Sequence, residues 1–154
     1  MLPELSRIVV PIDFSHSAHG SLDLACRLAA ERDAEVLVFH AFEAPMLSAV
    51  AMSVPAVTAA VGAQELHAKE QLDVLADSAQ GKHAVKVTSV SRRGRPESEI
   101  VRFAHDVHAD LVVICACGQS SNVRATDLGT VARAVLNQCE CPVLLMPPSH
   151  RHVD

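Results

Sequence analysis

Short apolar runs that alternate with helix-like segments are the feature that most constrains how this chain can fold. The runs that read as strands are residues 7–13, 35–41, 85–88, 110–116 and 142–146. The intervening segments repeat apolar residues at helical spacing, over 17–32, 68–81, 96–107 and 129–138. Nearly continuous apolar strands that alternate with helices are typical of a parallel sheet covered on both faces. The pattern predicts a single doubly wound α/β domain with a five-stranded parallel sheet.

Three local features refine this prediction. Residues 85–88 alternate apolar and polar side chains, which predicts an edge strand. Pro11 cannot donate to a sheet ladder, so we expect it near the end of its strand. Residues 44–64 carry no charge and are numerous enough to span a membrane. However, Pro55 interrupts the segment, and small or polar residues lower its apolar content. We therefore expect a mobile loop leading into a helix and no membrane span. With no linker in the sequence, residues 1–148 are expected to form one domain, followed by a flexible tail over 149–154.

Composition narrows the class of protein. The core must be aliphatic, because the chain has no Trp or Tyr and only four Phe. The net charge of −5 argues against nucleic-acid binding, and the short cluster Arg92, Arg93 and Arg95 reads as a solvated loop. The start of the chain lacks an apolar signal region, and five cysteines are an odd number, so reduced thiols and a cytoplasmic location are expected.

The stretch from Asp110 to Val131 is the best candidate for a binding site. An apolar run leads into a loop that begins at Gly118, and Gly129 and Thr130 then open a helix. Unpaired amides at a helix start favour anions. Ligands of open α/β sheets bind beyond the carboxyl ends of the strands, where the winding direction reverses. If the first and fourth strands are neighbours, Asp13 flanks the same crevice, either as an acceptor for a ribose or base, or simply as a turn residue.

Other common sites are not indicated. The sequence has neither G-x-G-x-x-G nor G-x-x-x-x-G-K-[ST], and it offers no convincing general acid–base pair, so we do not expect an enzyme. Cys115-x-Cys117 and Cys139-x-Cys141 could suggest a zinc site, but the pairs belong to opposite ends of adjacent parallel strands, roughly 15–20 Å apart. No metal site is therefore expected.

Two further readings concern reactive side chains. The histidine pairs 16/19 and 105/108 are each spaced along one helix face and are expected to be exposed. Cys115 and Cys117, near the crevice, keep open the alternative of a thiol redox sensor.

The chain also resembles the universal stress protein family over nearly its whole length. The matching segments, in order, are residues 11–15 (Pro-Ile-Asp-Phe-Ser), 38–41 (Val-Phe-His-Ala), 94–96 (Gly-x-Pro), 110–113 (Asp-Leu-Val-Val), 129–132 (Gly-Thr-Val-Ala) and 141–145 (Cys-Pro-Val-Leu-Leu). The resemblance implies strand order 3-2-1-4-5, as in adenine nucleotide alpha hydrolase-like folds. It also implies a homodimer paired through strand five, residues 142–146.

The resemblance further implies ATP binding, with Mg, in members that carry G-x2-G-x9-G-[ST]. By position, Asp13 and the backbone of Ala41 would face the adenosine, and Gly118, Gly129 and Thr130 would face the phosphates and ribose. The pocket would be lined by Pro11, Ile12, Ile114, Cys115 and Val131.

This sequence departs from the family motif in two places. Cys115 occupies the position of the first glycine, and ten residues rather than nine separate Gly118 from Gly129. A Cβ at Cys115 could crowd the nucleotide, and Asp127 could repel phosphate where Arg124 could attract it. Four hypotheses therefore stay open: an ATP-binding stress protein, a dimeric member that binds no nucleotide, a thiol sensor, and an ATP-hydrolysing or adenylating enzyme that uses the same crevice, which is the least favoured and would have at most weak ATP hydrolysis.

Overall fold

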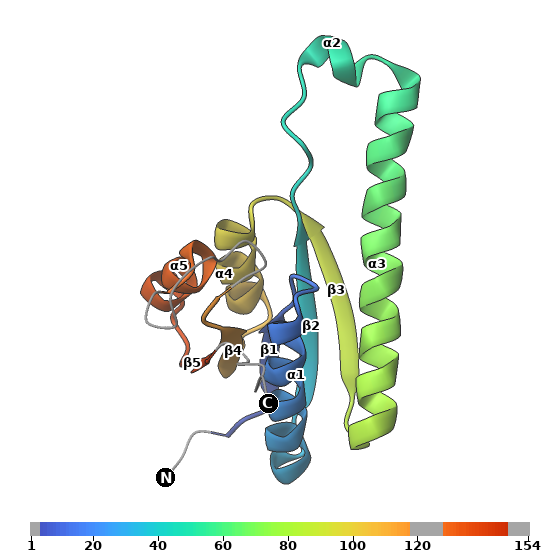
Figure 1. Cartoon of the computed structure of the whole chain (residues 1–154). Coiled ribbons are helices and arrows are strands. Elements are labelled where there is room, and N and C mark those ends of the chain that lie inside the picture. The colour runs from blue at the N-terminus through green and yellow to red at the C-terminus, as the bar shows by residue number, and fades with distance from the viewer. Residues whose placement is uncertain (1–3, 118–127, 148–154) are drawn as a thin grey trace, which may run out of the picture.

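A computed structural model describes residues 4–117 and 128–147 of the chain. Its elements are β1 (Arg7–Pro11), α1 (His16–Arg32), β2 (Glu35–Phe42), α2 (Ala49–Met52), α3 (Pro55–His83), β3 (Val87–Arg93), α4 (Pro96–Asp106), β4 (Leu111–Cys115), α5 (Thr130–Gln138) and β5 (Val143–Met146). The strands form one parallel sheet in the order β3-β2-β1-β4-β5 (Figure 1). The predicted fold class and strand order are confirmed, including the edge position of β3.

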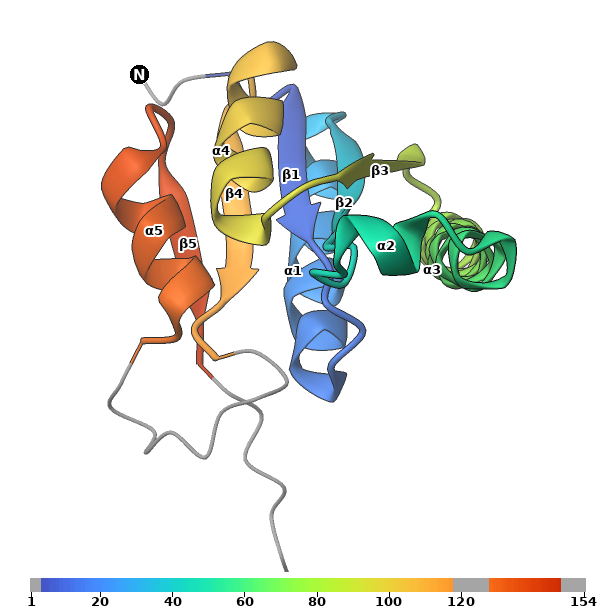
Figure 2. The same ribbon diagram turned by 90° about the horizontal axis from the view of Figure 1, so that it is seen from above.

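Helices cover both faces of the sheet, as Figure 2 shows from above. Alternate residues of β1 divide between the two layers: Val10 packs with α1 and α3, whereas Val9 packs with α4 and α5. Each layer is aliphatic, and Phe39 stacking on Phe103 at 4.5 Å is the main aromatic contact of the second layer. The fully buried strand centres follow from the apolar runs in the sequence.

A crevice opens where β1 and β4 separate at their carboxyl ends. The paired residues of these strands end at Val9 and Val112, although β4 continues to Cys115. The Ile12 amide donates to the Phe39 carbonyl of β2 at 2.7 Å, so the preceding residue, Pro11, faces β4. Proline has no N–H, and the next ladder bond to β4 cannot form. Pro11 is thus the last residue of its strand, as predicted, and it helps to open the crevice.

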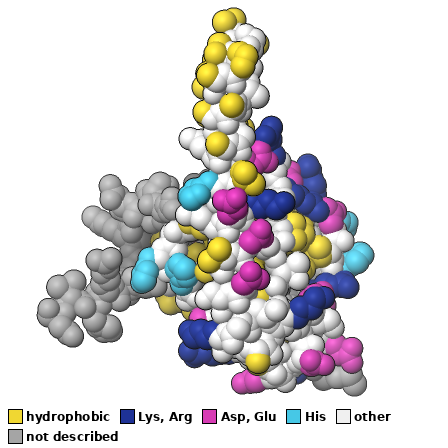
Figure 3. Space-filling view, turned by 90° about the vertical axis from the view of Figure 1, so that its right-hand side faces the viewer, with side chains coloured by type: hydrophobic (Ala, Val, Ile, Leu, Met, Phe, Trp, Pro, Cys, Tyr) yellow, Lys and Arg dark blue, Asp and Glu magenta, His cyan; other side chains and the backbone are white. Residues whose placement is uncertain are grey.

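The uncharged segment forms an arm that projects beyond the carboxyl ends of the strands (Figures 1 and 3). The expectation of a mobile loop here is wrong, because α2 lies within the segment and α3 begins at Pro55. Proline suits the first helical position, where its missing N–H would be unpaired in any case. Exposed apolar side chains gather on the arm: Met46, Leu47, Val50, Met52 and Val54. No helix in the described parts of the chain is long and apolar enough to cross a membrane.

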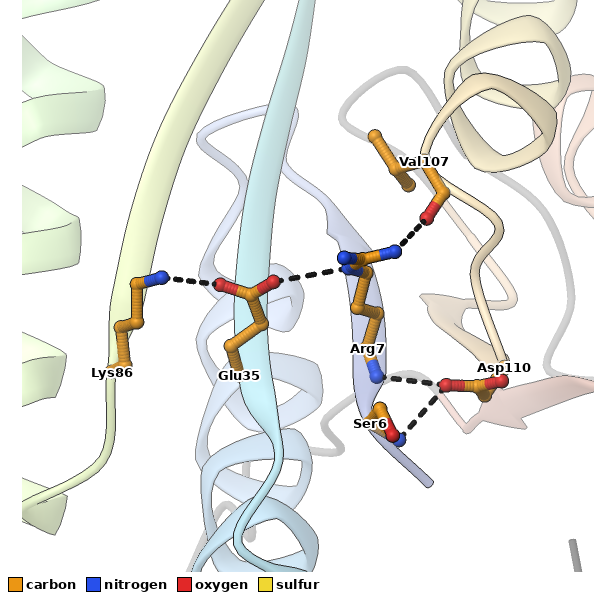
Figure 4. Close-up of polar contacts among 6 residues, drawn as sticks. All are labelled: Ser6, Arg7, Glu35, Lys86, Val107 and Asp110. Carbon is orange, nitrogen blue, oxygen red and sulfur yellow. Dashed lines mark hydrogen bonds and ion pairs between the residues drawn. The ribbon is translucent and has the colours of Figure 1, made fainter. Parts of the chain in front are cut away.

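Polar contacts connect the amino ends of the strands, at the end of the sheet opposite the crevice (Figure 4). The Asp110 carboxylate accepts the amides of Ser6 and Arg7 at 2.8 and 2.9 Å. The Arg7 guanidinium contacts Glu35 at 3.1 Å, and Lys86 contacts the other Glu35 oxygen at 2.9 Å. These contacts fix the amino ends of the strands relative to one another.

Two further expectations need correction. Arg92 and Arg93 do not lie in a solvated loop, since they end β3 and form ion pairs with Asp106 and Glu65. The helical spacing of residues 129–138 predicts that Leu136 faces inward with Ala132 and Val135, but Leu136 is 43% exposed, because on the short helix α5 it lies one residue beyond the buried Val135. The predicted tail, residues 149–154, lies outside the described residues.

Candidate functional site

The crevice between β1 and β4 contains a cavity of about 420 Å³. Its walls come from the carboxyl ends of β1, β2 and β4, the first turn of α5, one residue of α1 and two residues of α4. The lining residues are Pro11, Ile12, Asp13, Ala18, Phe39, His40, Ala41, Pro96, Ile100, Ile114, Cys115, Ala116, Cys117, Leu128, Gly129, Thr130, Val131 and Ala132. Its volume lies within the usual range of small-molecule sites, about 300–1,000 Å³.

The loop after β1 brings Asp13 to the rim of this cavity. One Asp13 oxygen accepts a hydrogen bond from the Ser15 amide at 2.9 Å. Asp13 is therefore a turn residue, which is one of the two roles that the sequence left open. Asp13 is also exposed and lines the cavity, so its other oxygen can accept a ligand donor. Phe14 adopts a φ of 59°, and its ring lies 4.8 Å from His40, whose Nδ1 is 2.8 Å from the Ile12 carbonyl oxygen. These contacts hold the Asp13 loop in place.

The first turn of α5 closes the cavity on the β4 side. Gly129 is the N-cap, and its amide donates to the Ala116 carbonyl at 2.8 Å, which anchors the helix start beside β4. Within residues 4–117 and 128–147, no side chain caps this helix start. The amides of Thr130, Val131 and Ala132 belong to the turn that has no intrahelical acceptors, and all three residues line the cavity. A helix start in this position favours a negatively charged group.

The cavity persists although Cys115 replaces a motif glycine. Cys115 is the last residue of β4, is paired in register with Met146, and lines the cavity. Ala41 and Ile114 form apolar walls nearby and are almost fully buried. The side chain at position 115 therefore narrows the space without filling it.

Charge is sparse at this site. Among the described residues that line the cavity, Asp13 alone carries a formal charge at neutral pH, with His40 as a titratable neighbour. No described lysine or arginine lines the cavity, so these walls could hold a phosphate through main-chain amides, the helix dipole and the Thr130 hydroxyl.

Nine of the ten site residues proposed from the sequence line this one cavity: Pro11, Ile12, Asp13, Ala41, Ile114, Cys115, Gly129, Thr130 and Val131. The tenth, Gly118, lies outside the described residues, as do Arg124 and Asp127. Sequence reasoning missed His40, Phe39, Pro96 and Ile100. Phe39 could have been found from its strand spacing, because it lies two residues before Ala41 and shares its face. The contribution of α4 left no comparable signal in the sequence.

The cysteine pairs lie at opposite ends of β4 and β5, as predicted. In the β4–β5 register Cys115 pairs with Met146 at the carboxyl end, whereas Cys141 precedes the start of β5. Within the described residues, no group of three or more His, Cys, Asp or Glu side chains has the arrangement of a metal site. His16, His19, His105 and His108 are exposed, as the sequence led us to expect.

The sheet order and the cavity at the point where the winding reverses define the chain as a doubly wound α/β protein with a candidate ligand site at that point. A sequence model of the universal stress protein family matches residues 4–147, so the chain belongs to that family. A universal stress protein of Methanocaldococcus jannaschii is 30% identical over 142 residues, which cover 91% of this chain and 81% of that relative.

Solved structures agree on the fold. Universal stress protein UspA of Lactobacillus plantarum superposes with a TM-score of 0.82 at 21% identity, covering 94% of this chain and 99% of that one. A universal stress protein of Archaeoglobus fulgidus, solved in complex with dAMP, has a TM-score of 0.65 at 25% identity, covering 93% of this chain and 98% of that one.

Proposed function

We propose that this universal stress protein binds ATP, with Mg²⁺, in the cavity between β1 and β4, and acts as a homodimeric stress-response binding protein rather than an enzyme. The observation that carries the proposal is the joint lining of one cavity by Asp13 and the first turn of α5. An acceptor at one end and unpaired amides at the other match the two polar ends of an adenine nucleotide.

The apolar walls of the cavity would surround the adenine base of the nucleotide. Ala41 and Ile114 are nearly buried and line the cavity, and the Asp13 carboxylate at its rim would accept hydrogen bonds from ribose hydroxyls. The dAMP complex of the Archaeoglobus fulgidus relative supports an adenine ligand for this fold family.

The phosphate end of the site rests on α5. The Thr130, Val131 and Ala132 amides would donate to phosphate oxygens, while Mg²⁺ would offset charge that no described lysine or arginine at the cavity neutralises. Main-chain amides at a helix start would hold a nucleotide by its phosphates, which favours a binding role.

Dimerisation through β5 is the second part of the proposal. β5 is an edge strand without a charged residue, and Leu144 is 37% exposed on it. An uncharged, apolar edge strand favours pairing with another strand. A second copy of β5 would cover Leu144 and extend the sheet across the dimer.

Co-purification and thermal stability test the nucleotide proposal. We expect adenine nucleotide in the mass spectrum of the released ligand, and a melting temperature at least about 5 °C higher at saturating Mg-ATP. Asp13→Asn keeps an acceptor for the Ser15 amide but removes the charge, so adenosine affinity should fall by about tenfold. Asp33→Asn is the matched control, because Asp33 is an exposed carboxylate at the far end of α1.

Two results would contradict the nucleotide proposal. A flat titration at millimolar ATP, or an equal loss of affinity in Asp13→Asn and Asp33→Asn, would leave a family member that binds no nucleotide at this cavity.

A further inference from the structure

The arm, residues 44–64, exposes large apolar side chains on a part of the chain that carries no charge. Met46 is fully exposed, and Val50 is 78% exposed. Figure 3 shows apolar side chains gathered on this projection, which stands clear of the rest of the domain. A concentration of exposed apolar residues usually marks a surface that binds another molecule.

The same chain has an apolar groove that its own arm does not fill. The groove lies between the start of α1 and the middle of α3, and its volume is about 600 Å³. Phe14 and Leu75 supply partly buried apolar surface, and Val74 is 69% exposed. His67 and Glu70, which are exposed, also line it, whereas none of residues 44–64 does. Apolar surface beside exposed polar residues is the usual composition of a protein interface.

We propose that the arm of one copy of this chain packs into the α1–α3 groove of a second copy, and that the second copy returns the contact. Each chain then supplies one apolar projection and one apolar groove. A reciprocal exchange of this kind closes around a twofold axis and leaves neither surface open. The partner that the arm fits is therefore another molecule of the same protein.

The geometry of α3 suits such an exchange. Gly62 lies midway between Pro55, next to the exposed apolar residues of the arm, and Glu70 of the groove, which are roughly 20 Å apart along the helix. Two antiparallel α3 helices that cross near Gly62 would place each arm on the groove of the other copy. No atom lies within 4 Å of a Cβ added at Gly62, and residues 59, 60 and 63 are exposed alanines. Small side chains at the crossing point let two helices approach closely.

The charge pattern favours a second copy over a membrane surface. Helices that lie on membranes carry Lys or Arg on their polar face, whereas residues 44–64 contain neither. The net charge of −5 also opposes binding to anionic lipids. An uncharged arm, in contrast, can enter the groove of an identical copy without bringing a like charge to it.

This contact is separate from pairing through β5. The strand order places β3, with α3 beside it, at one edge of the sheet and β5 at the other (Figure 2). In a dimer paired through β5 the two arms would lie at the far edges, so the exchange would join one dimer to the next. Two arm–groove contacts would bury on the order of 1,000 Å², which is small for a protein complex and corresponds to a Kd on the order of 100 µM.

Sedimentation equilibrium of Leu144→Asp between about 10 and 500 µM tests the proposal, because this substitution weakens pairing through β5. We expect the average mass to rise above 16.4 kDa across this range. Adding Val50→Asp on the arm, or Val74→Asp in the groove, should lower the association constant by at least about tenfold, since each buries an unpaired charge. Leu136→Asp, at a 43% exposed position on α5 outside both surfaces, is the control and should leave association unchanged. Melting curves of all variants should coincide.

A mixing experiment separates arm-in-groove contact from pairing of two arms. The Val50→Asp variant keeps an intact groove, and the Val74→Asp variant keeps an intact arm. An equal mixture can therefore form one intact arm–groove contact that neither variant forms alone, and it should associate more strongly than either.

Four results would overturn the proposal. These are a Leu144→Asp chain that stays monomeric at 500 µM, equal association in the Val50→Asp and Leu136→Asp variants, a mixture no stronger than its components, and binding to phosphatidylcholine vesicles in place of self-association.

Discussion

Gly94 is the residue at which the backbone leaves least choice of side chain. Its φ is 152°, and its amide donates to the Phe42 carbonyl at 3.0 Å, which connects β2 to the turn before α4. A Cβ here would lie 2.6 Å from Cγ of Glu99, a buried side chain held by Arg102 at 2.9 Å. Because α4 contributes Pro96 and Ile100 to the cavity, this turn also helps to shape the site.

Gly94→Ala should lower the free energy of unfolding by about 1–3 kcal/mol, from backbone strain and the contact with Glu99. Urea denaturation measures the change. Gly81→Ala is the control, since Gly81 is helical and nothing lies within 4 Å of its added Cβ. That variant should gain about 0.5–1 kcal/mol. Equal effects of the two substitutions would show that the Gly94 turn is not constrained.

At the scale of elements, Glu35 connects the amino ends of three strands. It contacts Arg7 on β1 and Lys86 just before β3 (Figure 4). The hydrogen bond from Lys86, with that from Arg7, holds the pKa of Glu35 below its ordinary value although partial burial opposes this. The contacts therefore favour the charged carboxylate in the folded state.

This pKa shift predicts a loss of stability in acid. Because the folded pKa lies below the unfolded one, Glu35 stabilises the protein above the unfolded pKa, and this contribution is lost as the pH falls through the folded pKa. Glu35→Gln should cost about 0.5–1 kcal/mol at pH 7 and progressively less toward pH 3. Glu31→Gln, at an exposed carboxylate on α1, should be neutral throughout. Parallel pH profiles for Glu35→Gln and wild type in urea melts would contradict the assignment.

The periodic spacing of apolar residues predicted the helices and strands that have one apolar and one polar face or a regular buried set. It did not predict the helices whose faces are alike in polarity. The strands and α1, α4 and α5 were predicted because their buried residues recur regularly. The first half of α3 and all of α2 were missed, because residues 44–64 are small, apolar and uncharged on every side and so show no helical stripe. Pro55 was interpreted as an interruption, whereas it begins a helix.

At the scale of the whole molecule, strand order decided how much of the site could be predicted. Asp13 and Thr130 are far apart in sequence, and only the placement of β1 beside β4 brings them to one cavity. The contributions of Phe39, His40 and α4 depended on packing between layers, which no single segment of sequence encodes. The ion pairs of Arg92 and Arg93 were missed for the same reason.

The prediction about dimer assembly concerns the free edge of β5. Leu144→Asp would place a charge on the proposed dimer edge and should weaken the dimer by at least about tenfold. Sedimentation equilibrium of the 16.4 kDa chain measures this, with wild type expected at twice that mass. Leu66→Asp, on α3 and 56% exposed, should remain dimeric. A monomeric wild type, or a dimer unaffected by Leu144→Asp, would exclude pairing through β5.

The central claim is that bare amides at the start of α5 hold the phosphates of a nucleotide, and calorimetric titration of Thr130 variants tests it most directly. Thr130 is exposed at the first position of α5 and lines the cavity, so Thr130→Glu adds a charge that suits the helix dipole but repels phosphate. We predict that Thr130→Glu loses at least about tenfold in ATP affinity while keeping its affinity for adenosine and its stability. Thr130→Gln should bind both ligands nearly as wild type does. ATP affinity unchanged in Thr130→Glu, or no heat from wild type with millimolar ATP, would contradict the account.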